Sequence, residues 1–334
     1  MDDLHGNYDF LMFANVDFKH PEVREDVVRW GQWMIEDTGV EGFRLDAVQH
    51  FSYNFTREWV QRIQETSRRK RGKDAFVVGE FWTDEVKRIT SWLDVVGQSA
   101  YAYDSPLLYG FSRISEDVRM GSANADLRTI MRDSLLQIRP QNAVTLVSNH
   151  DTQFGQASYT PISADHKALF YAFILLRRDG YPCVFWGDMY GTKGRHAEPP
   201  ACLVSDGKGG RRSLLPDLML ARKLFAYGEQ RDYFDAMSCI GWTRAGTTDK
   251  AGCAVLLSIG PADKYTQKKM TFGRPGERYT DVLANQGQRA EVEIDAKGCG
   301  VFPCKGMSTS VFVRVDAVDL QQFPVAYNHH VDAI

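Results

Sequence analysis

The chain has 334 residues, of which 43% are hydrophobic and 25% charged, and its formal net charge is −3. These values are typical of a globular protein with one large domain, or a large domain and a small one. The near-neutral charge gives no electrostatic reason to expect nucleic acid as a partner. No run approaches the roughly 18 apolar residues that span a bilayer, so we expect no membrane partner either.

The N-terminal stretch MDDLHGNYDF has neither the basic region nor the apolar core of a signal peptide. As written, the chain would be cytoplasmic, although the sequence leaves the compartment open. Its six cysteines show no C-x-x-C spacing, which argues against a zinc site.

From about residue 20 to 226, short apolar runs alternate with segments of helical period. The expected helices are 21–38, 57–68, 84–95, the later part of 99–111, 165–179 and 214–226. The expected strands are 40–48, 74–82, the earlier part of 99–111, 142–151 and 181–188. This alternation predicts parallel strands joined by crossover helices, and the continuous apolar runs indicate strands covered on both faces.

After about residue 229 the segments become short, alternating and punctuated by glycine, which predicts an antiparallel β-domain of about six to eight strands. We expect this domain to cover 229–316 and a disordered tail to cover 317–334. Nothing in the β-domain has a catalytic pattern.

Polar side chains follow the expected strands at their carboxyl ends, where parallel α/β folds place their working residues. The carboxyl groups among them are Asp46, Glu80 and Asp151. Each alone more often caps a helix or pairs with a lysine, but three at one sheet edge suit the acid and nucleophile of glycoside hydrolysis. Arg44 lies two residues before Asp46, so on a strand their side chains share one face, and Arg44 would keep that carboxylate ionised.

The stretches GFRLDAVQH, VVGEFW and LVSNHD resemble the second, third and fourth signature regions of the alpha-amylase family of glycoside hydrolases, in the same order. GNYDFLMFANVDFKHPEV, GYPCVFWGDMYGTKG, ARKLFAYGEQRDYFD and IGWTRAG also resemble liquefying bacterial-type alpha-amylases and their fungal relatives. The resemblance implies a (β/α)8 TIM barrel, an inserted calcium-binding subdomain and a C-terminal antiparallel β-sandwich. It also implies retaining endo-hydrolysis of α-1,4-glucan.

On the matching positions, the resemblance makes Asp46 the nucleophile, Glu80 the general acid and base, and Asp151 the third carboxylate. The positions that it implies for substrate binding are Arg44, Gln49, His50, Trp82, Asn149 and His150. Trp82 would stack on a sugar, although a core tryptophan is the alternative.

The resemblance further implies a Ca²⁺ ion, held by Asp9, Asn15 and Asp17 and by the backbone carbonyl of His50. Carboxylate and amide oxygens are the donors that this hard cation prefers. Asn15 stands where such relatives usually carry aspartate, which lowers the negative charge of the site. Gln49 stands where many carry lysine.

Only the fourth to eighth barrel strands have counterparts, so the resemblance indicates an N-terminally truncated chain. Residues 1–20 would then end the inserted subdomain, and 21–228 would form a partial barrel of α/β class. We expect a monomer that acts on α-glucan polysaccharide or oligosaccharide. The alternatives are an inactive fragment or glucan-binding remnant, and a related maltooligosaccharide-forming or transglycosylating enzyme.

Overall fold

The structure is a computed structural model and describes residues 14–284 and 289–326. The chain divides into two compact units: one contains residues 1–107 and 133–145, and the other contains 108–132 and 146–334. Within the described residues, no helix is both long enough and apolar enough to cross a bilayer.

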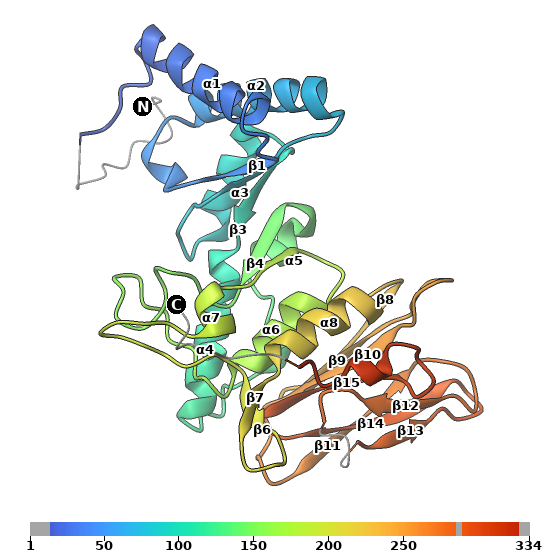
Figure 1. The fold of residues 1–334 in the computed structure, drawn as a ribbon. Coiled ribbons are helices and arrows are strands. Elements are labelled where there is room, and N and C mark those ends of the chain that lie inside the picture. The colour runs from blue at the N-terminus through green and yellow to red at the C-terminus, as the bar shows by residue number, and fades with distance from the viewer. Residues whose placement is uncertain (1–13, 285–288, 327–334) are drawn as a thin grey trace. The chain divides into compact units, whose positions relative to one another are not determined.

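The first unit is built on parallel strands with helices between them (Figure 1). Its elements are α1 (Pro21–Glu36), β1 (Gly42–Leu45), η1 (Val48–His50), α2 (Tyr53–Arg71), β2 (Phe76–Gly79), α3 (Val86–Val96), β3 (Ala100–Tyr103), α5 (Leu135–Ile138), η3 (Pro140–Asn142) and β4 (Ala143–Leu146), whose last residue belongs to the second unit. Strands β1 to β4 pair in parallel in chain order. The predicted alternation of strands and helices is therefore confirmed.

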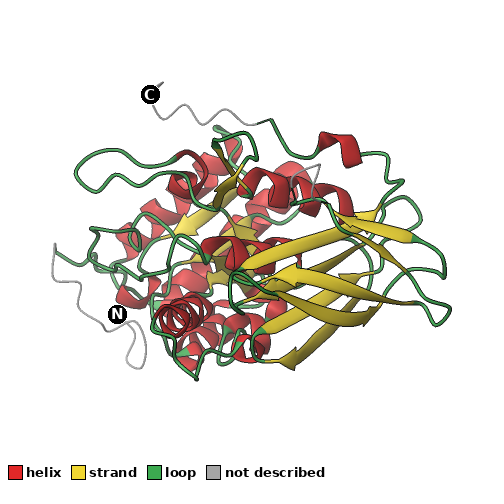
Figure 2. Ribbon diagram, turned by 90° about the horizontal axis from the view of Figure 1, so that it is seen from below, coloured by secondary structure: helices red, strands yellow, loops and turns green. Residues whose placement is uncertain are grey.

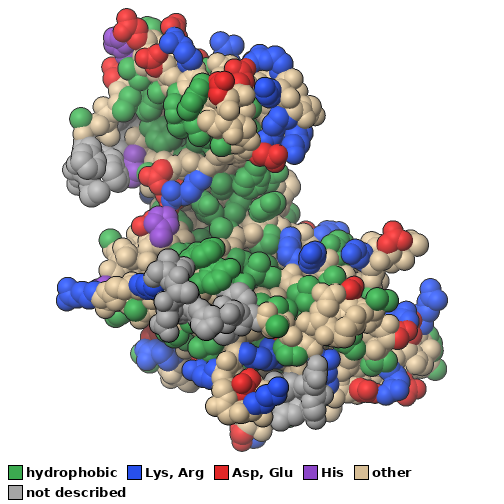
Figure 3. All heavy atoms as spheres, in the orientation of Figure 1, with side chains coloured by type: hydrophobic (Ala, Val, Ile, Leu, Met, Phe, Trp, Pro, Cys, Tyr) green, Lys and Arg blue, Asp and Glu red, His purple; other side chains and the backbone are tan. Residues whose placement is uncertain are grey.

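Burial differs along this sheet. All residues of β4 are buried, whereas β1, which ends the sheet, has none that is fully buried. The expectation that every strand is covered on both faces is wrong for β1. Over α1 and α2, acidic and basic side chains are interspersed at the surface (Figure 3), and Trp30 and Trp33 of α1 are about half exposed.

Helix α4 (Ser105–Arg119) begins in the first unit and continues into the second. The other elements of the second unit are η2 (Leu127–Thr129), α6 (Lys167–Leu176), β5 (Tyr181–Cys183), α7 (Trp186–Tyr190), β6 (Leu203–Ser205), β7 (Arg211–Ser213), α8 (Leu215–Phe225), β8 (Gln230–Ala236), β9 (Cys239–Arg244), β10 (Cys253–Ser258), β11 (Tyr265–Thr271), β12 (Arg278–Asp281), β13 (Glu291–Glu293), β14 (Cys299–Lys305), β15 (Ser308–Arg314) and η5 (Leu320–Gln322). Nine of the ten residues of α6 are buried, so this helix lies inside the unit and is not an amphipathic surface helix.

The described strands after residue 229 form a six-stranded antiparallel sheet, in the order β13-β12-β15-β10-β9-β8, and a separate pair, β11-β14 (Figure 2). Their facing sides bury a cluster that includes Met270, Phe302 and Phe312. This confirms the expected C-terminal β-domain.

Two predictions in the second unit are wrong. The expected strand 181–188 ends at Cys183, and Asp188 lies on helix α7 instead. The helix begins after Phe185, whose carbonyl accepts a hydrogen bond from the Asp188 N–H at 3.1 Å. The expected disordered tail has an ordered element in its described part: η5 is followed by Phe323, which is fully buried with its ring 6.0 Å from that of Phe225.

Candidate active site

Arg44 joins two carboxylates in the first unit. Its Nη1 donates to Asp46 Oδ1 at 2.8 Å, and its Nη2 lies 2.9 Å from Glu80 Oε1. Arg44 is in β1 and Asp46 follows that strand directly, so the shared face that the spacing predicts brings them together. Glu80 follows β2, which pairs with β1 in register, Leu45 beside Gly79.

The two carboxylates have different surroundings. The Asp46 side chain is 74% exposed, whereas that of Glu80 is 11% exposed. Burial raises the pKa of Glu80, and the Asp46 carboxylate adds to this through its charge and a side-chain hydrogen bond. The Arg44 charge and a hydrogen bond from the Ala47 N–H act in the opposite direction, but the net shift is upward.

The backbone after Asp46 turns sharply to close the site. Ala47 has φ 46° and ψ 46°, a left-handed conformation that is uncommon for a residue with a Cβ. In this conformation its N–H points to Glu80 Oε2 at 3.3 Å, and the next N–H, of Val48, donates to the Glu80 carbonyl at 3.0 Å. The turn thus ties the end of β1 to the end of β2.

The third predicted carboxylate lies in the second unit, after β4. The Oδ1 of Asn149 accepts hydrogen bonds from the N–H groups of Asp151 and Thr152, at 3.0 and 2.9 Å. This side chain therefore holds a turn that presents His150 and Asp151 to solvent. His150 Nε2 lies 3.0 Å from Asp151 Oδ2.

In the second unit, Asp188 accepts hydrogen bonds from a cluster of polar side chains that the sequence analysis did not predict. Lys167 Nζ and the Tyr171 hydroxyl donate to its two oxygens, each at 2.6 Å, and the Ser148 hydroxyl also donates. Burial raises the pKa of Tyr171 well above its usual value, and the Asp188 charge adds to this, so the hydroxyl remains a donor. The signal was present in the sequence, since Lys167 and Tyr171 are four apart and share one face of α6.

The remaining predicted substrate residues lie near the ends of β1 and β2. Gln49 and His50 are in the short helix η1 and are half-buried, and Trp82, two residues after Glu80, is also half-buried. Within the described residues, the side-chain oxygen of Gln49 is buried without a hydrogen-bond partner.

The predicted calcium ligands are only partly described. Asp9 lies outside the described residues, and Asn15 and Asp17 are exposed. Among the described residues, no group of three or more His, Cys, Asp or Glu side chains could hold a metal ion. The next residue, Phe18, stacks on Phe55 with ring centroids 4.5 Å apart and lies 5.7 Å from Phe51, so the segment after Asp17 packs beside the segment after His50.

The family profile described as "Alpha amylase, catalytic domain" matches residues 4–209. The chain belongs to the alpha-amylase family. It is 38% identical over 315 residues to an alpha-amylase of Bacillus licheniformis. The aligned region covers 93% of this chain and 57% of that protein. The chain is 36% identical over 318 residues to a glucan 1,4-alpha-maltohexaosidase of Bacillus sp. (strain 707), again with 57% of that protein covered.

Among solved structures, alpha-amylase I of Eisenia fetida in complex with maltohexaose has the same fold, with a TM-score of 0.64 at 15% identity. That likeness covers 89% of this chain and 66% of the other. The fold is thus the parallel (β/α) sheet of this family's barrel, followed by its C-terminal β-domain. The chain spans a little over half the length of the two curated relatives.

Proposed function

We propose that this chain hydrolyses internal α-1,4-glucosidic bonds of starch- or glycogen-type glucans with retention of configuration. The observation that carries the proposal is the carboxylate pair Asp46 and Glu80, bridged by Arg44 at 2.8 and 2.9 Å. A retaining mechanism uses two carboxyl groups about 5–5.5 Å apart, close enough for one to attack the sugar directly. One guanidinium in contact with both carboxylates supports this short separation.

The different surroundings of the pair suit two different roles. Glu80 is buried and its pKa is raised, which favours a protonated acid that can donate to the leaving oxygen. Asp46 is exposed and lies 2.8 Å from the Arg44 guanidinium, so its carboxylate is oriented and open to the sugar carbon that a nucleophile attacks. Family membership supports the same assignment, with Asp46 forming the glycosyl-enzyme intermediate.

The other sites remain proposals that rest on the resemblance. We propose Asp151 as the third carboxylate, and Arg44, Gln49, His50, Trp82, Asn149 and His150 as substrate-binding residues. Because the Asn149 oxygen already accepts two backbone hydrogen bonds, its contribution would be to orient the turn that bears His150 and Asp151.

We also propose a Ca²⁺ site from Asp9, Asn15, Asp17 and the backbone carbonyl of His50. The oxygen donors and the packing of Phe18 against Phe51 support it. Its role would be to join the two segments and stabilise the end of β1. Calcium should raise the unfolding temperature of the full chain, and Asp17→Asn should reduce that rise; an equal rise in both proteins would contradict the assignment.

The test of function is a reducing-end assay of the full chain on soluble starch, with product anomers followed by NMR. We expect mixed oligosaccharide products of α configuration, and an Asp46→Asn variant without activity. A folded chain that releases no reducing ends, or that releases β products, would contradict the proposal. A folded chain without activity would favour a glucan-binding protein, which affinity electrophoresis in starch would then detect.

Product size separates the alternatives within the family. One relative is named a glucan 1,4-alpha-maltohexaosidase, so a product of fixed length is the second candidate activity. Maltohexaose as the dominant early product would support that activity, and oligosaccharides longer than the substrate would support transglycosylation. We further propose that the enzyme is a monomer, which light scattering would test.

A further inference from the structure

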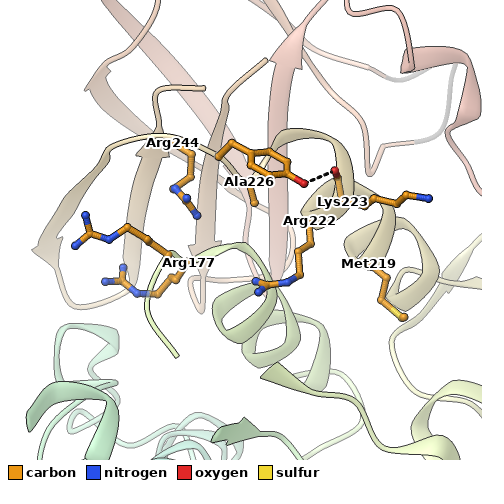
Figure 4. A pocket seen from close by; sticks show the side chains of 8 residues that line it. Arg177, Met219, Arg222, Lys223, Ala226 and Arg244 are labelled. Atoms are coloured by element: carbon orange, nitrogen blue, oxygen red, sulfur yellow. Dashed lines mark hydrogen bonds between the residues drawn. The ribbon is translucent and has the colours of Figure 1, made fainter. Parts of the chain in front are cut away.

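A cavity of about 290 Å³ in the second unit is lined mainly by cations (Figure 4). Five of its lining residues are basic and none is acidic; they are Arg177, Arg178, Arg222, Lys223 and Arg244. They come from three separate elements: two directly follow α6, two lie in the last turn of α8, and one ends β9. The proposed glucan chemistry does not use any of them.

The cations of this cavity are only partly neutralised. Arg177 makes a bidentate ion pair with Asp232 at 2.8 and 2.9 Å, and Arg178 lies 3.4 Å from Asp179. Arg222 and Arg244 have no carboxylate within ion-pair distance in the described part of the chain. They donate instead to backbone carbonyls: Arg222 to Leu175, and Arg244 to Leu176 and Gly228.

A purely structural role explains part of this arrangement. Leu175 and Leu176 end α6, so two arginines cap its last carbonyls, where the helix dipole favours positive charge. The C-terminus of a helix is equivalent to about half a negative charge, so the C-termini of α6 and α8 together offset about one cation. Five cations and two neighbouring carboxylates leave three positive charges. One of these is on Lys223, which is exposed to solvent, so after the helix ends are counted about one arginine charge remains without compensation.

Burial makes this remaining charge costly. Arg244 is only 5% exposed, and burial lowers the pKa of both Arg222 and Arg244, with neighbouring arginines adding to the effect at Arg244. Arg177 is 3% exposed, and its Nε is a buried donor without an acceptor in the described part of the chain. A bound anion would offset the charge and could accept hydrogen bonds that the chain itself leaves unmade.

We propose that this cavity binds a phosphate-type oxyanion, either as inorganic phosphate or as the phosphomonoester of a small sugar. Guanidinium groups favour this ligand because their planar donors match the oxygens of phosphate. The volume is near the lower limit of small-molecule pockets, about 300 Å³, which suits a phosphate with at most one sugar ring.

The test is calorimetric titration of the full chain at low ionic strength with inorganic phosphate, glucose 6-phosphate and glucose. We expect saturable binding of both phosphates and none of glucose. Tighter binding of glucose 6-phosphate would identify the phosphomonoester as the ligand, and equal binding would identify phosphate itself. The absence of saturable binding by either phosphate would overturn the proposal.

Variants locate the binding. Arg222→Gln should weaken phosphate binding by about tenfold or more, the effect of losing one charge-assisted hydrogen bond. Since Arg222 also caps α6, Arg178→Gln is a second variant with less risk to folding, because that side chain is 63% exposed. Lys208→Gln, on an exposed loop outside the cavity lining, is the control and should bind as the unmodified chain does. Unchanged affinity in both arginine variants, or an equal loss in the control, would overturn the proposal.

Discussion

Two clusters in this chain place a carboxylate beside a cation, in opposite surroundings. In the first unit, Arg44 holds the exposed Asp46 and the buried Glu80. In the second unit, Asp188 is enclosed and accepts from Lys167, Tyr171 and Ser148. Asp46 and Asp188 each occur shortly after a strand in the sequence, so position along the chain alone does not separate them.

The difference lies in access and in unused hydrogen-bonding capacity. The Asp188 side chain is 6% exposed and its oxygens are occupied by donors, which is typical of a structural cluster. Asp46 is 74% exposed and has an opposing carboxyl of raised pKa, an arrangement that costs stability and suits catalysis. Mutations should therefore affect stability at one cluster and rate at the other.

The largest expected effect is on stability, at Asp188. Asp188→Asn leaves Lys167 buried without its counter-charge, which should lower the free energy of unfolding by about 3–5 kcal/mol. Urea unfolding followed by circular dichroism measures this. Asp46→Asn is the matched control and should change stability by less than about 1 kcal/mol, because that side chain is exposed. Similar losses in both variants would remove the distinction between the clusters.

Next in size is the effect of Glu80→Gln on rate. Glutamine keeps the shape of the side chain but cannot donate the proton, so kcat should fall at least about a hundredfold. The unfolding temperature should change little. Near-normal kcat with an unchanged fold would exclude Glu80 as the general acid.

A smaller effect is expected at Ala47, in the turn that follows Asp46 and contacts Glu80. Ala47→Gly relieves a left-handed conformation that costs an alanine about 1–2 kcal/mol, partly offset by the greater freedom of glycine when unfolded. The net result should be a gain of about 0.5–1 kcal/mol in the free energy of unfolding. Ala47→Val should be destabilising, and the reverse order of the two variants would show that this turn is not strained.

The subtlest effect is on pH dependence. The Arg44 charge lowers the pKa of Glu80 and so opposes its burial. Arg44→Gln removes that charge, so the pKa of Glu80 should rise and the protonated acid should persist to higher pH. The alkaline limb of the kcat/KM profile should then move to higher pH. A shift to lower pH would show that this limb reports another group.

The sequence predicted the first unit well because its strands are apolar runs bounded by clear helix signals. It also predicted the meeting of Arg44 and Asp46, since two residues of separation along an extended chain fix a shared face. The hydrogen bond of the Ala47 N–H to Glu80 could not be predicted, because a left-handed alanine is set by tertiary contacts rather than by local preference.

The second unit was harder to predict. The run YPCVFWGD has the apolar character of a strand, yet it divides into β5 and α7, because short apolar runs do not distinguish strand from helix. The basic cavity was also missed. Its cations lie up to 67 positions apart in the chain, between Arg177 and Arg244, and only the fold brings them together.

The central claim is that Asp46 attacks the sugar while Glu80 donates the proton. A fluorinated α-glucosyl fluoride that slows breakdown of the intermediate, followed by peptide mass spectrometry, tests it most directly. The account predicts one covalent sugar on the peptide containing Asp46, and none in the Asp46→Asn variant. A sugar on any other carboxylate, or equal labelling of the Asp46→Asn variant, would contradict it.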